Sequence, residues 1–290
     1  WWLAVVPDVL WLPLLAGFIA SSLRRTRQMH NYPIIVMLAL LALANALAFS
    51  GLAHGDVEAQ RDAAFAAIWL IAALMTMIGG RVIPFFTRNA LGQPTASPNT
   101  APASLVSLLP DLALMALTLL VAACSAVGLL ATPRLPLAFL FGLLTLGHTL
   151  RLWRWHRRGI WRIALLWPLH VSYGWMMLSC GGLTLFHLGL PIFFSQTLHA
   201  LTVGAMGGLI LAMIVRVSLA HTGRPLEAPQ AMGYAFLLFH LGAAARIFLI
   251  FWLPLAGLVI AATLWVMAFA LFLFCHGPML CRPRVDGQAG

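Results

Sequence analysis

Residues 33–52 read PIIVMLALLALANALAFSGL, a run of twenty residues without a charge. A helix of about 20 apolar residues is long enough to cross the hydrocarbon core of a bilayer, so this stretch predicts a transmembrane helix. The whole chain has the same character, with 62% hydrophobic and 8% charged residues and a mean hydropathy of +0.96. Soluble domains carry about 25% charged residues, and the composition therefore excludes a water-soluble fold.

Eight further segments match this length and composition. We therefore predict an all-α fold, a polytopic transmembrane helical bundle of nine spans that takes in residues 1–290 as one unit. Pro7, Pro13 and Pro168 lie inside predicted spans, where a proline kinks the helix or marks a later start. The nine predicted spans are residues 1–20, 33–52, 63–82, 107–130, 135–153, 163–187, 196–219, 231–252 and 255–275.

The arginines orient this bundle. The chain has 17 basic residues, all of them arginine, and 7 acidic ones. Successive connecting segments of a nine-span bundle alternate between the two sides of the membrane, so the arginines can be counted by side. Fourteen lie on one side and two on the other, and Arg246 lies inside a span. Cytoplasmic loops carry the excess of arginine, so we expect the richer side, and with it the C-terminus, in the cytoplasm. The richer side holds Arg24, Arg25, Arg27, Arg81, Arg88, Arg151, Arg154, Arg157, Arg158, Arg162, Arg216, Arg224, Arg282 and Arg284.

Two connecting segments have distinctive compositions. Residues 88–106 are rich in proline, alanine, serine and threonine and predict a flexible cytoplasmic linker. Residues 151–162, RLWRWHRRGIWR, mix arginine with tryptophan, the composition of an anchor at the membrane interface. Nucleic-acid binding uses the same residue types, but a short loop between spans favours the lipid bilayer as partner, and no nucleic acid is expected. The four cysteines lack C-x-x-C spacing, which argues against a disulfide framework or an iron–sulfur cluster.

Ten histidines are the strongest chemical signal, because polar side chains in a bilayer are costly and need partners. Counting from the predicted helix ends places His148 and His170 at one depth near the cytoplasmic side, and His187 and His199 near the outer face. Histidines at equal depth on facing helices can supply both axial nitrogens of a b-type haem. The alternative for each is a hydrogen-bonded helix residue. His240, alone at its depth, is expected to be a hydrogen-bonding contact rather than a ligand.

Glycines and arginines add to this signal. Gly204 and Gly208 form a small-x-x-x-small pattern, which favours close helix packing or, alternatively, room for the edge of a porphyrin. Haem propionates are anions that need cations, and Arg246 is the costliest charge of the chain because it lies within a span. Arg81 and Arg216 lie at the inner boundary, where they either snorkel to the interface or pair with an anionic group.

The chain lacks the residues that several classes of protein require for their function. The adjacent histidines and the His-Pro-Glu stretch that haem–copper oxidases require are absent. The chain also contains no G-x-x-x-x-G-K-[ST] phosphate loop, no G-x-S-x-G elbow and no H-E-x-x-H zinc motif. Hydrolytic and ATP-driven chemistry therefore have no support.

Three stretches resemble the NnrS family of bacterial membrane proteins. HALTVGAMGGLILAMIVRVSLAHTGRP, residues 199–225, resembles the most characteristic segment of the family. GGRVIPFFT, residues 79–87, and PLHVSYGW, residues 168–175, are similar to two further segments and occur in the expected order. The resemblance covers essentially the whole chain. The histidines that match the family pattern are His170, His199 and His221.

The resemblance implies a function. NnrS proteins are inner-membrane proteins linked to nitric oxide metabolism, denitrification and nitrosative stress, and are described as containing haem and copper. It therefore implies a protein of the bacterial inner membrane with haem b and, as a second metal, copper. Nitric oxide or a related small molecule would be its ligand, and a membrane component its electron donor. The metal ligands that it implies are His170, His199 and His221. The further residues expected at the cofactor are His148, His187, Arg81, Arg216 and Arg246.

This chain departs from the family pattern in one respect. Members usually have about twelve spans by the same length criterion, and the early segment of the form Trp-His-x-His-Glu does not occur here. We therefore expect the N-terminal helices of the family to be missing, together with any ligand that they supply.

The spacing of two family-matching histidines separates their roles. His199 and His221 are 22 residues apart, which in a continuous helix is about 33 Å. They cannot bind one metal ion, and we expect His199 to be the haem ligand and His221 to belong to a second site or to be structural. Two other functions stay open: a permease-like carrier with a polar path lined by histidine and arginine, and an assembly factor without chemistry of its own.

Overall fold

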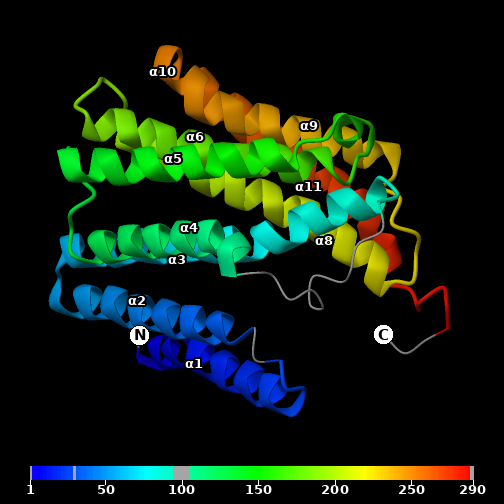
Figure 1. Ribbon diagram of the computed structural model, residues 1–290, viewed down its shortest axis with the longest axis horizontal. Helices are drawn as coiled ribbons and strands as arrows, with labels where there is room; N and C mark the ends of the chain where they lie inside the picture. Colours follow the sequence, from blue (N-terminus) through cyan, green and yellow to red (C-terminus); the bar gives the residue numbers. More distant parts are fainter. Residues whose placement is uncertain (1, 29–30, 94–104, 288–290) are drawn as a thin grey trace. The chain divides into compact units, whose positions relative to one another are not determined.

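The computed structural model describes residues 2–28, 31–93 and 105–287, and this part of the chain is helical without any strand (Figure 1). The first helices are α1 (Trp2–Arg25), α2 (Tyr32–His54), α3 (Val57–Ala90), α4 (Leu105–Ala126), α5 (Leu135–Trp155) and α6 (Trp167–His187), with a short 3₁₀ turn, η2 (Arg158–Arg162), before α6. A continuous helix follows, made of α7 (Phe194–His199), the π-helical η3 (Ala200–Gly207) and α8 (Gly208–His221). The next combines α9 (Gln230–Ala244), the π-helical η4 (Ala245–Leu249) and α10 (Ile250–Trp252), and α11 (Pro254–Leu280) is the last.

These helices confirm the predicted polytopic all-α fold. In the described residues, eight helices are long and apolar enough to cross a membrane. Each of the nine predicted spans corresponds to one helix, and the one near 163–187 begins late, at Trp167, because Pro168 occupies its first turn. The span predicted at 63–82 is longer, since α3 runs over 34 residues and contains Pro84. Its start is set by Asp56, whose side chain accepts a hydrogen bond from the Ala59 amide at 2.9 Å.

The linker expected at 88–106 is shorter in the structure. Helix α3 extends to Ala90, and α4 begins at Leu105. Most of the predicted linker, residues 94–104, lies outside the described residues.

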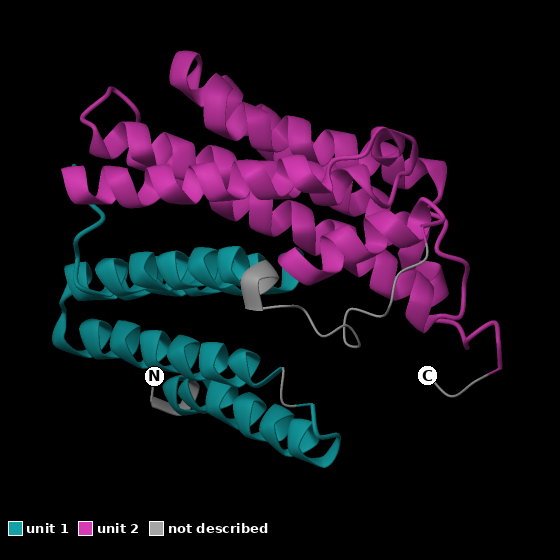
Figure 2. Ribbon diagram, in the orientation of Figure 1, with its two compact units in different colours: residues 1–79, 104–133 teal, residues 80–103, 134–290 magenta. Residues whose placement is uncertain are grey.

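The chain forms two compact units, coloured separately in Figure 2. Unit 1 consists of residues 1–79 and 104–133. Inside it, α1 packs on α2, and Asn45 of α2 donates a hydrogen bond of 3.0 Å to the carboxylate of Asp8. This contact gives the acidic side chain of α1 a polar partner, as a buried or membrane-exposed charge requires.

Unit 2 consists of residues 80–103 and 134–290 and contains all the candidate site residues. Helix α6 is its centre, because it contacts α5, α7, η3, α8 and α9. Leu169, Tyr173, Met176 and Leu183 on α6 are almost fully buried. Since neighbouring helices cover α6, it can carry polar side chains that a lipid-facing helix could not, and it is the one predicted span that is not among the eight helices apolar enough to cross a membrane by composition.

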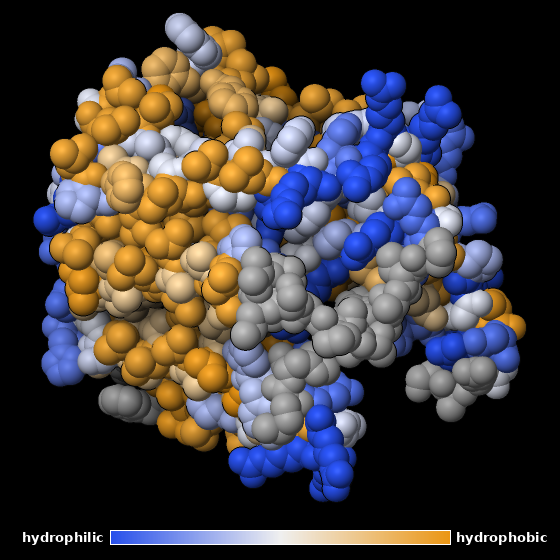
Figure 3. All heavy atoms as spheres, viewed as in Figure 1, coloured by the Kyte–Doolittle hydropathy of each residue, from blue (hydrophilic) through white to orange (hydrophobic). Residues whose placement is uncertain are grey.

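The outer surface of unit 2 divides into apolar and polar zones. Exposed apolar residues of α11 include Leu255, Val259, Val266 and Phe274, as expected for a helix that faces lipid. Figure 3 shows hydrophobic side chains along α5 and hydrophilic ones gathered beyond its C-terminal end, over the η2 turn. We call the side of unit 2 formed by residues 156–166, 222–229 and 281–287 the arginine-rich end.

Candidate functional site

His199 and Arg246 form a hydrogen-bonded pair between two long helices. The guanidinium of Arg246 donates to Nε2 of His199 at 2.9 Å. Nδ1 of His199 donates to the backbone carbonyl of Ser195 at 2.5 Å, which leaves the Nε2 lone pair directed away from its own helix. Both side chains are half-buried. Within the described part of the chain, Arg246 is thus partnered by a histidine and not by a carboxylate.

Irregular helix geometry marks both members of this pair. The π-helical segment η3 begins directly after His199, and Arg246 lies within the π-helical segment η4. π-helical turns are rare and occur frequently at functional sites, because the wider turn re-aims side chains. The two segments therefore single out the His199–Arg246 pair on geometric grounds.

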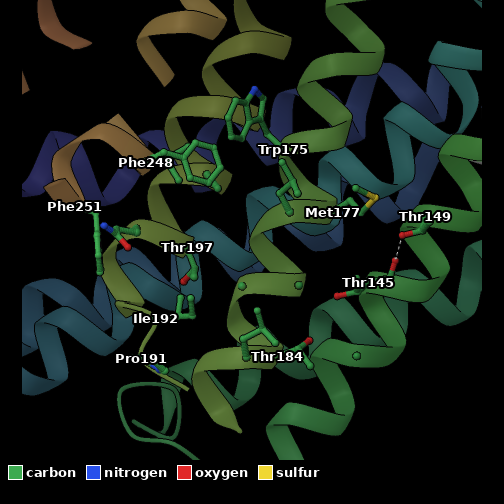
Figure 4. A pocket seen from close by; sticks show the side chains of 18 of the residues that line it. Thr145, Thr149, Trp175, Met177, Thr184, Pro191, Ile192, Thr197, Phe248 and Phe251 are labelled. Atoms are coloured by element: carbon green, nitrogen blue, oxygen red, sulfur yellow. Dashed lines mark hydrogen bonds between the residues drawn. The ribbon is translucent and has the colours of Figure 1, made fainter. Parts of the chain in front are cut away.

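A large cavity of unit 2 lies beside this pair, between α5, α6, α7 and the η4–α10 segment (Figure 4). It has a volume of about 880 Å³. The aromatic rings of Trp175 and Phe248 lie together on one side, and Thr145 and Thr149 of α5 on another (Figure 4). Among the described residues that line it, Gln196 has the only amide side chain. Such a mostly apolar cavity with few polar groups is typical of a small-molecule or cofactor site.

The glycine pattern of the 199–225 stretch serves helix packing. A Cβ atom on Gly204 would lie 2.5 Å from Cγ of Trp175, and one on Gly207 would lie 2.8 Å from Cζ of Phe239. A Cβ on Gly208 would collide with Ser172. The space beside these glycines is therefore filled by side chains of α6 and α9, as close packing requires.

His240 lies deep in the same packing layer. It is 8% exposed, and its Nδ1 accepts a hydrogen bond of 3.2 Å from the indole of Trp175. This confirms the prediction that His240 is a hydrogen-bonding helix contact.

A second polar cluster joins α5 to α6. Arg151 donates to the hydroxyl of Tyr173 at 2.9 Å, and that hydroxyl lies 2.8 Å from Nδ1 of His148. His148, Arg151 and Tyr173 are all at most 6% exposed. The guanidinium of Arg151 also lies over the ring of Trp155. His148 is thus held in a buried network whose other members, Arg151 and Tyr173, the sequence analysis did not single out.

The three family-like segments meet in a third cluster. Thr87 lies 3.5 Å from Nε2 of His170, whose Nδ1 donates to the carbonyl of Leu166. Arg216 stacks over the ring of Phe86 at 4.0 Å and donates to the carbonyl of Leu165 at 2.9 Å. Arg216 is 7% exposed, so other parts of the protein cover its side chain. Segments 79–87, 168–175 and 199–225 are therefore brought together by tertiary packing.

The remaining candidates lie apart from these clusters. Nδ1 of His187 accepts a hydrogen bond from the Arg134 amide at 3.3 Å, and its ring stacks on Phe141. Arg81 is exposed on α3. His221 is exposed at the end of α8, and its carbonyl accepts a hydrogen bond from Arg284. The pairings of His148 with His170 and of His187 with His199 stay predictions.

The described residues contain no group of three or more His, Cys, Asp or Glu side chains able to hold a metal ion. His276, which the sequence placed at the inner margin, is fully buried on α11 and stacks on Phe272 at 4.8 Å. Neither of its ring nitrogens has a hydrogen-bond partner in the described part of the chain. Its burial follows from packing against other helices, which no local pattern reveals.

Comparison with known proteins identifies the family. No curated protein and no solved structure matches the chain. The family model of the NnrS protein matches residues 1–284, almost the entire sequence. The chain therefore belongs to the NnrS family of proteins, here with the multi-pass helical fold of a membrane protein.

Proposed function

We propose that this chain is a haem-binding protein of the bacterial inner membrane that acts in the nitric oxide response. Family membership supports a role in that response. Its arginine-rich end, with the C-terminus, would lie in the cytoplasm, as the uneven distribution of arginines favours. The observation that carries the haem assignment is the His199–Arg246 pair beside the large cavity.

His199 has the features of a residue that would hold the haem iron. Metal-binding histidines usually donate their second ring N–H to a carbonyl or carboxylate, and Nδ1 of His199 donates to the Ser195 carbonyl. That tautomer leaves Nε2 as the coordinating atom, and Arg246 already places a cation beside it. Gln196 and Ala200, the neighbours of His199 along the helix, line the cavity of about 880 Å³. Since the side chain of Arg246 is long and half-buried, it can turn from Nε2 to a propionate.

When bound, the haem would supply an iron that can bind nitric oxide. The chain's own residues would hold the group in place. Apolar side chains such as Trp175 and Phe248 would exclude water from its ring, and Arg246 would neutralise an anionic substituent. His148 and His170 are alternative ligands, each in a buried polar cluster.

Copper is the second metal that the family implies. The described residues offer no group of three ligands for it. Our proposal therefore concerns haem. Metal analysis of the purified protein tests whether copper is bound as well.

The optical spectrum of the purified full chain, with and without nitric oxide, tests the proposal. We expect a Soret band that shifts when nitric oxide is added. His199→Ala should lower the haem content while the protein still inserts into the membrane, whereas His221→Ala should leave the haem content unchanged, because the two positions are about 33 Å apart along the helix. A preparation without a Soret band and without iron would refute the haem assignment. Measurable substrate flux would then favour the carrier, and its absence an assembly factor.

A further inference from the structure

A smaller cavity lies at the arginine-rich end of unit 2, between the end of α8, the loop after it and the end of α11. Figure 1 shows these ends on the same side of the bundle. The cavity has a volume of about 460 Å³. The residues that line it are Leu219, Arg224, Pro225, Glu227, Pro229, Cys275, Pro278, Met279 and Arg282. Two cations and one carboxylate therefore face a space large enough for a small anionic group.

Arg224 carries an unsatisfied donor. Its Nη1 atom is inaccessible to solvent, and it has no hydrogen-bond partner among the described residues. A buried donor on a charged group costs more free energy when unpaired than a neutral one does. The nearby carboxylate does not relieve this cost, because in the described part of the chain Glu227 forms no salt bridge with Arg224 or Arg282. The Arg224 side chain therefore has an unmet donor, and an acceptor reaches that donor only when the side chain turns into the cavity that it lines.

The loop that presents Arg224 is held in place by the C-terminal segment. Gly223 has a φ of 72° and lies against the carboxylate of Asp286, where a Cβ atom would be 2.7 Å from Cγ. The amide of Val285 donates to the carbonyl of Thr222 at 3.2 Å. Asp286 itself binds Arg284 at 2.6 Å, so Arg284 is neutralised locally. Arg224 and Arg282 consequently remain as the cations available to a ligand in the cavity.

We propose that this cavity binds a phosphate group of an anionic molecule, either the headgroup of an anionic phospholipid or free phosphate. The planar guanidinium donates two parallel hydrogen bonds, and this geometry matches phosphate oxygens. The cavity lies at the ends of two membrane-spanning helices, at the level where lipid headgroups are found. This site is separate from the residues assigned to haem and does not depend on that assignment.

The thermal unfolding of the purified full chain in detergent tests the site. Phosphatidylglycerol, phosphatidylcholine and sodium phosphate are added in separate titrations. We expect phosphatidylglycerol to raise the midpoint temperature of unfolding in a saturable manner and phosphatidylcholine to have no such effect. Stabilisation by phosphatidylglycerol alone assigns the site to a lipid, and equal stabilisation by sodium phosphate assigns it to the free anion. If neither probe raises the midpoint, the proposal is wrong.

Variants with opposite expected effects separate binding from misfolding. Arg224→Gln should weaken the apparent affinity for the stabilising probe, phosphatidylglycerol or phosphate, about tenfold or more, because it removes a charge-assisted hydrogen bond. Arg282→Gln should weaken it as well, and Glu227→Gln should strengthen it by removing the carboxylate from the lining. Arg282 and Glu227 are exposed, so neither substitution should prevent folding. Arg157→Gln, in the 151–162 loop, is the matched control and should change nothing. Unaltered affinity in both Arg282→Gln and Glu227→Gln would overturn the assignment.

Discussion

Replacing Gly204 with alanine should destabilise unit 2, although alanine is the better helix former. The new methyl carbon would lie 2.5 Å from Cγ, 2.8 Å from Cδ2 and 2.9 Å from Cβ of Trp175. These atoms form the root of the indole and cannot swing aside as the end of a flexible side chain would. Trp175 must therefore shift, which weakens its hydrogen bond to His240.

The expected change in the free energy of unfolding of Gly204→Ala combines three contributions. Overpacking of a filled core costs about 1–3 kcal/mol, and the loss of the Trp175–His240 hydrogen bond about 1 kcal/mol. The gain from replacing a helical glycine with alanine offsets roughly 0.5–1 kcal/mol. We therefore expect a net loss of about 1–3 kcal/mol in the free energy of unfolding, measured in detergent by tryptophan fluorescence.

Gly233 provides the matched control for this substitution. It lies in α9, and a Cβ atom there would meet nothing within 4 Å. Gly233→Ala should accordingly leave stability unchanged or raise it slightly. In a Trp175→Leu background the cost of Gly204→Ala should fall, since the ring that causes the collision is gone. Equal stability of Gly204→Ala and Gly233→Ala would show that the packing argument is wrong.

Three further predictions concern the other polar clusters and the topology. Tyr173→Phe should cost about 1.5–3 kcal/mol of unfolding free energy in the same assay, because the lost hydroxyl accepts a hydrogen bond from a buried arginine. Arg216→Gln should lower the free energy of unfolding by about 2 kcal/mol or more, since it removes a cation–π contact and a charged hydrogen bond. Arg157→Gln should have little effect on the free energy of unfolding. Equal, small losses of unfolding free energy in both variants would count against a buried role for Arg216. Single cysteines at Gly159 and Ala228 should react with an impermeant reagent only when the cytoplasmic side is accessible, and labelling of either from the periplasm would reverse the proposed topology.

The sequence alone determined the fold class and the helix positions. Apolar runs such as 33–52 have a length set by the bilayer, and in lipid the backbone must satisfy its hydrogen bonds within each helix. For this reason residue counting is sufficient to locate the helices, and the start near Trp167 follows from a proline that cannot continue a preceding turn. The family also follows from local order, because the 199–225 stretch is a continuous motif.

The site needed tertiary structure. The sequence singled out His199 and Arg246, but their contact across 47 residues depends on how two helices are rotated and on π-helical turns that carry no composition signal. The glycine pattern left a choice between packing and space for a cofactor, and the Trp175 ring fills that space. Burial of Arg216 and the unpaired donor of Arg224 likewise depend on residues far away in the chain. Helix periodicity determines which residues lie in the membrane, whereas the partner of each polar side chain is decided by the packing of one helix against another.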